Sequence, residues 1–411
     1  MSPVKLAFVI PTRNRPAMAM TAVRHLCGQD GGDIAIFVFD NSKSAADAAR
    51  LADFCGKLGD PRVTYVRSPA DLSQGRHWDY ALRQALARSD VTHVTIHYDR
   101  KIMRPEAAGI LCGVAARHPG QVVTYLTDSI THLPPPRRLW QVVWTGALYR
   151  LETARIVEAS AAGEALEIGN QLPILSNCLV PRAVAEALVE RFGTLCESTT
   201  ADSCFTYRFC ALFDDFLHLD RPLSILYGSH RSAGIGYLSG GGSGDFADYR
   251  QTWQGEAWLD AAIVPGLNLG YNMLFHEYEL VRRHQAGSRL PPLDREACLR
   301  DLGRGLTWIG DPKRREATRA VLLEHGWDGR SADGGVPRPL PLWKRFAWRA
   351  HQSVTLLRAD WLGATPATIT GFGFASDRRA LRYGLKYPRR ATESAAHLDR
   401  VAPVEIEPPQ G

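Results

Sequence analysis

Residues 5–16 read KLAFVIPTRNRP, an apolar run that ends abruptly in a polar turn closed by proline. Further apolar runs follow along the chain, at Ile34–Asp40, Val63–Val66, Val91–Tyr98 and Gln121–Leu126. They are continuous, as expected for parallel strands that are buried on both faces. Segments of helical length separate them, at Ala17–Cys27, Ala45–Gly56, His77–Ala87 and Pro105–Arg117. The pattern predicts a doubly wound α/β sheet, which binds ligands beyond the carboxyl ends of its strands.

The composition excludes several classes of protein. The chain has 411 residues, and its 49 Lys and Arg exceed its 43 Asp and Glu, for a net charge of +6. This mild excess suits an anionic substrate such as a nucleotide and lies far below that of a dedicated nucleic-acid binder. No uncharged apolar run reaches the roughly 18 residues of a membrane-spanning helix. The 8 cysteines are scattered, without C-x-x-C or zinc-type spacing, and predict reduced, structural thiols in a cytoplasmic protein.

The remaining chain is less regular. Mixed patterns predict strands at Val142–Tyr149, Pro173–Val180 and Leu223–Tyr227 and helices at Arg182–Phe192 and Asp202–Phe213. After a Gly/Ser-rich loop at Gly234–Gly244, helical patterns occur at Trp253–Ala262, Tyr271–His284, Asp294–Leu302 and Lys313–His325. We therefore expect an α/β domain over residues 1–235, a helical extension over 236–333, a basic amphipathic region over 334–401 and a disordered tail over 402–411.

Each strand of the opening sheet ends in a polar group. In chain order these groups are PTRNRP from residue 11, DNSKS from residue 40, LSQGRHWDYAL from residue 72 and DRKIMRP from residue 99. Together they resemble the nucleotide-sugar-binding half of the family-two inverting glycosyltransferases of the GT-A fold. The likeness covers about residues 3–235 and fades after residue 130. It implies a GT-A-like mixed sheet, followed here by a mainly helical C-terminal extension.

The resemblance also implies an activity. Family members move a sugar from a nucleotide-diphosphate donor to an acceptor hydroxyl, with inversion, in polysaccharide or glycoconjugate synthesis. By resemblance, Asp40 contacts the base or ribose, Asn41 is a further substrate-binding candidate, and Thr12 and Arg15 lie beside them. Arg76 lies where the family's loop approaches the diphosphate, a charge that a guanidinium suits. The structural alternatives are turn and capping roles for Thr12 and Asp40 and a solvated position for Arg76.

The family's D-x-D motif appears here as Asp99-Arg100-Lys101. Its two carboxylates normally hold a divalent cation, Mn or Mg, that neutralises the departing diphosphate. Lys101 takes the place of the second carboxylate, and Asp99 alone holds such a metal weakly. We expect metal dependence to be weak or lost, with Arg100 or Lys101 stabilising the diphosphate instead. The alternative is a degenerate site in an inactive relative.

An inverting transferase also needs a general base for the acceptor hydroxyl. By resemblance this base is Asp202, at the start of a helix, with Ala201 in place of the family's Glu. The same segment also fits an ordinary helix N-terminus stabilised by an acidic side chain. Asp214 and Asp215 are reserve candidates for the base.

Two further segments resemble parts of the acceptor and diphosphate sites. The run Tyr227-Gly228-Ser229-His230-Arg231-Ser232 resembles the family's aromatic–x–x–His–x–x–Ser ending, in which the histidine meets the metal or diphosphate. His230 is alternatively a loop residue without a ligand. Gly146 and the Ser176–Asn177 pair are competing candidates for the acceptor-side loop.

The C-terminal region carries a helical face of apolar side chains, with basic residues elsewhere on the segment. The face consists of Trp343, Phe346, Ala350, Val354, Leu357 and Trp361. It predicts either packing onto the catalytic domain or contact of residues 343–361 with an anionic membrane surface, peripheral to the inner face of that membrane.

The residues leave other functions open. A glycan, a lipid-linked glycan and a small molecule all fit as acceptor. A non-catalytic nucleotide- or glycan-binding protein on the same fold is one alternative function. A nucleotidyltransferase is another, although Pro11–Asn14 lacks the Gly-rich phosphate loop expected after its first strand.

Overall fold

A computed structural model describes residues 4–131, 138–142, 144–164, 171–228, 231–232, 244–253, 258–284 and 289–330, with short pieces at 372–373, 381, 385 and 403–404. The main strands are β1 (Lys5–Thr12), β2 (Asp33–Asp40), β3 (Val63–Arg67), β4 (His93–Ile96), β6 (Val123–Thr131), β8 (Leu148–Glu152), β9 (Cys178–Pro181) and β10 (Asp215–Leu226). Short strands add to them, at β5 (Lys101–Met103), β7 (Arg138–Trp140), β11 (Phe372–Gly373) and β12 (Pro403–Val404).

The strands of the described residues form one mixed sheet of 12 strands, with the order β12–β8–β10–β6–β9–β4–β1–β2–β3 along its main path. Its N-terminal half is parallel: β1 lies between β2 and β4, and β3 pairs with β2. Strand β9 joins the halves by antiparallel pairing with both β4 and β6. In the second half β10 is parallel to β6 and antiparallel to β8. The doubly wound mixed α/β sheet expected from the sequence is confirmed.

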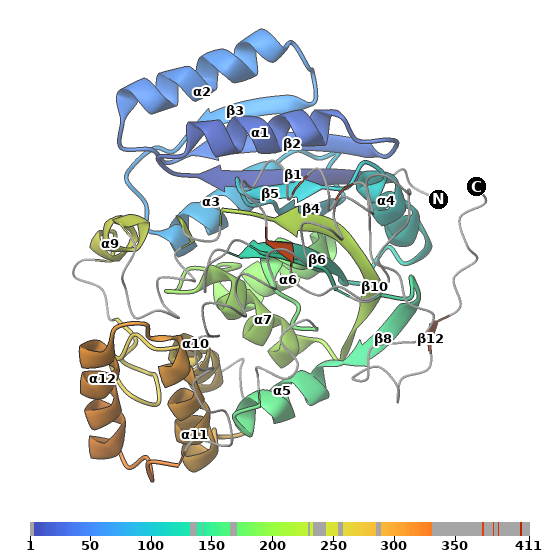
Figure 1. Ribbon diagram of the computed structural model, residues 1–411. Coiled ribbons are helices and arrows are strands. Elements are labelled where there is room, and N and C mark those ends of the chain that lie inside the picture. Colours follow the sequence, from blue (N-terminus) through green and yellow to red (C-terminus); the bar gives the residue numbers. More distant parts are fainter. Residues whose placement is uncertain are drawn as a thin grey trace.

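Helices cover both faces of this sheet (Figure 1). The helices of the N-terminal part are α1 (Pro16–Cys27), α2 (Ala45–Leu58), α3 (Gln74–Leu86), α4 (Ala107–Arg117), α5 (Thr153–Ala161), α6 (Arg182–Phe192) and α7 (Ala201–Leu212). They are followed by α9 (Gly244–Gln251), α10 (Asn272–Arg283), α11 (Arg295–Gly305) and α12 (Pro312–Glu324). The described residues also include the 3-10 turns η1 (Leu175–Asn177) and η4 (Leu306–Trp308).

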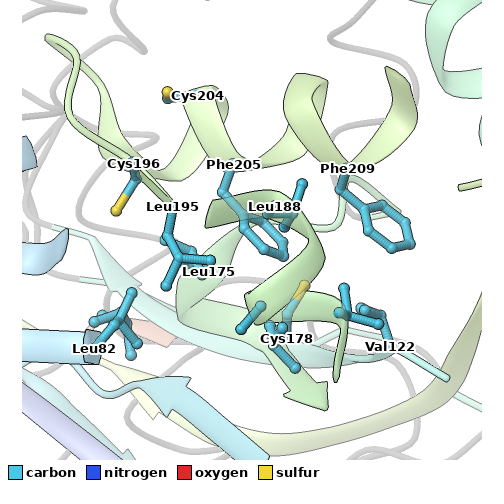
Figure 2. Packing of buried hydrophobic residues seen from close by; sticks show 14 of the residues in the cluster. Leu82, Val122, Leu175, Cys178, Leu188, Leu195, Cys196, Cys204, Phe205 and Phe209 are labelled. Atoms are coloured by element: carbon cyan, nitrogen blue, oxygen red, sulfur yellow. The ribbon is translucent and has the colours of Figure 1, made fainter. Parts of the chain in front are cut away.

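Strand β1 explains why both faces are covered. Phe8 and its neighbours at alternate positions belong to a core that they share with residues of α1, α2 and α4, whereas Val9 belongs to the core on the opposite face, with residues of α3, α6 and α7. On that second face, Phe205 and Phe209 of α7 point toward the sheet (Figure 2), with ring centroids 6.0 Å apart. Each fully buried side chain of this size contributes about 1.5–3 kcal/mol. A strand that is apolar on both sides is therefore stable only between two layers of helices.

The C-terminal extension is mainly helical, as expected. Helices α10 to α12 enclose a core of their own that includes Phe275, Leu302 and Leu322. This group is tied to the sheet domain where Tyr278 of α10 meets Tyr207 of α7, with ring centroids 5.0 Å apart. Within the described residues, no helix has the length and apolarity needed to cross a bilayer.

Some expectations were wrong in detail. The helix expected at Trp253–Ala262 is absent from the described residues 258–262, which form turns instead. Leu259 there has φ 52°, and Gly266 shortly after has φ 72°, both outside the helical region. Strand β8 begins at Leu148 and not at Val142, whose amide is held by the Asp128 carboxylate at 2.9 Å. Of the tail expected to be disordered over 402–411, Pro403–Val404 are described and pair with β8 as β12. The rest of that tail and the basic region over 343–361 lie outside the described residues.

Candidate active site

A cavity of about 210 Å³ opens at the carboxyl ends of β1, β2 and β4. Its walls come from the loops that follow these strands, from the first turns of α3 and α7, and from α9. Ligands of α/β sheets bind at this edge because loops from neighbouring strands converge there. The cavity therefore lies where the sequence motifs predicted a binding site.

Arginine side chains gather on one part of the wall. Among the described residues, four arginines line the cavity: Arg13, Arg15, Arg100 and Arg231. Arg100 Nη2 donates to Ser232 Oγ at 2.8 Å, and burial lowers the pKa of this guanidinium. A planar guanidinium offers paired donors that match the oxygens of a phosphate. This wall is suited to a diphosphate.

Asp99 lies behind the arginines and is only 1% exposed. Its Oδ2 accepts a hydrogen bond from Thr12 Oγ1 at 2.8 Å and lies 2.9 Å from Arg15 Nε. A divalent cation needs several free oxygen ligands. Among the described residues, no group of three or more His, Cys, Asp or Glu side chains could hold one. A carboxylate already engaged by a guanidinium, with Arg100 and Lys101 following it, does not fit such a metal.

The nucleoside candidates Asp40 and Asn41 have different surroundings. Asp40 is fully buried, and its carboxylate accepts from the Ser42 amide at 2.8 Å and from the Tyr65 hydroxyl at 2.9 Å. Asn41 lines the cavity, and its Nδ2 donates to the Leu72 carbonyl at 2.7 Å. Asp40 thus stabilises the loop after β2 from its buried side, whereas Asn41 forms part of the cavity wall.

The structure places one of the two other candidates, Arg76, and does not describe the second, His230. Arg76 lines a separate pocket on the other side of α3, together with Asp79 and Arg83. His230 lies outside the described residues, whereas the neighbouring Arg231 and Ser232 line the cavity.

Asp202 lies at the start of α7 and lines the cavity. The Tyr98 hydroxyl donates to its Oδ2, and the Ser176 amide donates to its Oδ1 at 3.2 Å. Burial raises the pKa of Asp202, while these hydrogen bonds and the charges of Lys101 and Arg100 oppose that rise. A carboxylate whose pKa is raised toward neutrality is a stronger base when it is ionised.

The reserve candidates for the base are remote from the cavity wall. Asp214 has an 81% exposed side chain paired with Arg289, and Asp215 pairs with Arg150 at 2.8 Å. Gly146 also lies away from it, where its amide donates to the Asp220 carbonyl at 2.9 Å. The neighbourhood of Asp202 therefore includes Ser176 from the competing acceptor-side segment and excludes Gly146.

Helix α9 supplies a wall that no motif indicated. Asp248 Oδ2 lies 2.8 Å from Arg13 Nε, and its Oδ1 lies 2.6 Å from Lys43 Nζ. The next residue, Tyr249, donates from its hydroxyl to the Thr199 carbonyl. Helix α9 thus connects the loops after β1 and β2 with the entry to α7, and Figure 1 shows it at the edge of the sheet. The contacts of Asp248 leave no signal in the sequence because its partners, Arg13 and Lys43, lie more than 200 positions away.

The helical extension also reaches this region. Glu277 of α10 is fully buried, and its Oε1 accepts from the Thr200 amide at 2.7 Å. Burial raises the pKa of Glu277 to about 8. Because Thr200 lies two residues before Asp202, α10 supports the segment that presents the candidate base.

Comparison with known proteins gives a limited result. No protein-family model matches the chain, and no curated protein matches it. Among solved structures, the complex of S. aureus TarS with UDP-GlcNAc is similar with a TM-score of 0.44 and 12% identity, over 78% of this chain and 89% of that chain. The UDP complex of the same protein gives a TM-score of 0.43 and 14% identity, with the same coverage of both chains. Similarity at this level carries no inference about activity.

Proposed function

We propose that the protein is a glycosyltransferase that moves a sugar from a nucleoside-diphosphate donor to an acceptor hydroxyl, with inversion. One observation carries the proposal: Asp202, the candidate base, and the guanidiniums of Arg15 and Arg100 line the same cavity. The order of the strand-end motifs along the chain is its second support.

The leaving group would be stabilised by the arginines that line the cavity, Arg13, Arg15, Arg100 and Arg231, here called the arginine wall. As the bond from the sugar to the diphosphate breaks, negative charge collects on the departing phosphate. Donors that are already fixed in position stabilise this charge without further reorganisation. Arg15 is fixed by Asp99, which Thr12 holds in turn, and Arg100 is fixed by Ser232. We propose that these cations replace a divalent metal and that added metal is not required.

Asp202 would activate the acceptor hydroxyl as a general base. Its carboxylate removes the proton of the acceptor hydroxyl while the oxygen attacks the anomeric carbon from the face opposite the diphosphate. Each carboxylate oxygen accepts more than one hydrogen bond, so the contacts with Tyr98 and Ser176 leave room for the acceptor. The base must be ionised to act, and the nearby charges of Arg100 and Lys101 favour that form.

The test is a direct assay of transfer. Thermal shift with UDP, GDP, CDP and dTDP sugars identifies the donor, since a ligand that binds the folded state raises its apparent stability. Mass spectrometry of the glycosylated product, with EDTA and with Mn²⁺, then measures turnover.

The outcomes separate the alternatives. We expect transfer at the same rate with EDTA. Binding without transfer favours the non-catalytic binding protein, and no binding of any nucleotide sugar refutes the proposal.

A further inference from the structure

Lys101 occupies an unexpected place for a residue at a diphosphate motif. Its side chain is only 1% exposed, and it does not line the cavity, although Tyr98 and Arg100 on the same loop do. Burial of a lysine is costly unless partners compensate its charge. The charge of the buried ammonium must therefore be compensated by groups inside the protein.

The contacts of Lys101 lead to the base and not to the arginine wall. Its Nζ donates to the carbonyl of Ser176, and the amide of the same Ser176 donates to Asp202 Oδ1 at 3.2 Å. The Nζ also lies 5.7 Å from the ring of Tyr98, whose hydroxyl donates to Asp202 Oδ2. A second ring, that of Tyr125, lies 5.4 Å away. Of the two groups that hold the Asp202 carboxylate, Ser176 is therefore hydrogen-bonded to Lys101, and the ring of Tyr98 lies within cation–π distance of it.

We propose that Lys101 is a positioning residue for the general base: it fixes Ser176 and supplies the buried positive charge that keeps Asp202 ionised, and it does not bind the diphosphate. The proposal rests on the function proposed above, because it assigns Lys101 to the base of that reaction.

The electrostatic surroundings of Asp202 support this assignment. The titratable groups that act on it are Tyr98, Arg100 and Lys101 from the segment after β4, Cys178 from β9 and Cys196 from the loop before α7. Only Arg100 and Lys101 among them are cations. Arg100 lies on the cavity wall and donates to Ser232, so Lys101 is the one of these two cations that lies on the interior side. Burial lowers the pKa of Lys101, and the charge of Asp202 opposes that fall and favours the ammonium form.

Loss of the Lys101 charge is expected to change the pH dependence of kcat. Without the charge of Lys101, the pKa of Asp202 rises, and the base stays protonated up to a higher pH. The acidic limb of the pH profile of kcat then moves upward. A residue that binds the diphosphate would instead change the affinity for the donor.

The experiment compares Lys101→Met with Lys101→Arg. The probe for binding is UDP, or the nucleoside diphosphate that stabilises the wild type most, and kcat is measured between pH 5 and 9. For Lys101→Met we expect the acidic limb to move up by about one pH unit, a tenfold loss of rate on that limb. The dissociation constant of the nucleoside diphosphate stays within about twofold, and Lys101→Arg, which keeps the charge, retains the wild-type limb.

A second variant guards against misfolding. Lys101→Gln lacks the charge but keeps a polar N–H donor on a side chain one methylene shorter, so we expect the same upward move from it if Lys101→Met does not fold. A tenfold loss of affinity for the nucleoside diphosphate, with an unchanged acidic limb, overturns the assignment of Lys101 while leaving the transferase function intact. A wild type that binds no nucleoside diphosphate and transfers no sugar overturns both.

Discussion

Glu277 offers a quantitative test of how the helical extension supports the cavity. It is fully buried on α10 and accepts from the Thr200 amide at 2.7 Å. Burial raises its pKa from 4.5 to about 8, because the carboxylate loses more hydration free energy than its hydrogen bonds and the nearby positive charge restore. The folded protein therefore keeps this proton at neutral pH, whereas the unfolded chain releases it.

The magnitude follows from proton linkage. A carboxyl whose pKa is raised in the folded state destabilises the fold progressively as the pH rises from its unfolded value to its folded value. At pH 7 the distance from the unfolded value is about 2.5 pH units, which corresponds to about 3 kcal/mol. Glu277→Gln imitates the protonated acid and can still accept from Thr200. We expect the variant to match the wild type near pH 4 and to exceed its free energy of unfolding by about 3 kcal/mol at pH 7.

The assay is urea unfolding of both proteins at several pH values, followed by fluorescence. Glu279→Gln is the matched control on the same helix, because Glu279 is paired with Arg282 at 2.8 Å and with Arg283 at 3.4 Å. We expect no gain that grows with pH in this control. A difference between Glu277→Gln and the wild type that is constant from pH 4 to 8 refutes the reasoning.

Further predictions concern the cavity itself. Arg15→Met weakens binding of the nucleoside diphosphate at least tenfold in calorimetry, since a lost hydrogen bond to a charged group costs about 1.5–3 kcal/mol; an unchanged affinity contradicts the arginine wall. Asp248→Asn loosens α9 from Arg13 and Lys43, so that hydrogen exchange at residues 246–253 accelerates while that of α12 stays the same. Removal of divalent cations with EDTA leaves the transfer rate unchanged, and a rate restored only by Mn²⁺ contradicts the proposed replacement of the metal by cations.

The sheet could be predicted because its signal is local. A continuous apolar run such as Leu6–Ile10 is stable mainly as a strand that is covered on both faces. The helical segments between such runs are long enough to provide that cover. The cavity could be located for the same reason, since the polar groups Thr12 and Asn41 directly follow such runs.

The orientation of Lys101 and the contacts made by α9 and α10 could not be predicted, because they depend on segments that are distant in the sequence. Whether Lys101 faces the cavity or the interior is decided by Ser176 and Asp202, which lie 75 and 101 positions further along the chain. The contact of Asp248 with Arg13 and that of Glu277 with Thr200 likewise leave no periodic pattern. The missed turn at Leu259 shows that local helical propensity gives way to tertiary packing.

The most direct test of the account is the pair Asp202→Asn and Asp214→Asn. The same change is made once on the cavity wall and once at an 81% exposed side chain. We expect Asp202→Asn to lose transfer while its affinity for the nucleotide donor stays close to that of the wild type, and Asp214→Asn to retain both. Wild-type turnover by Asp202→Asn would contradict the assignment of the base and, with it, the proposed reaction.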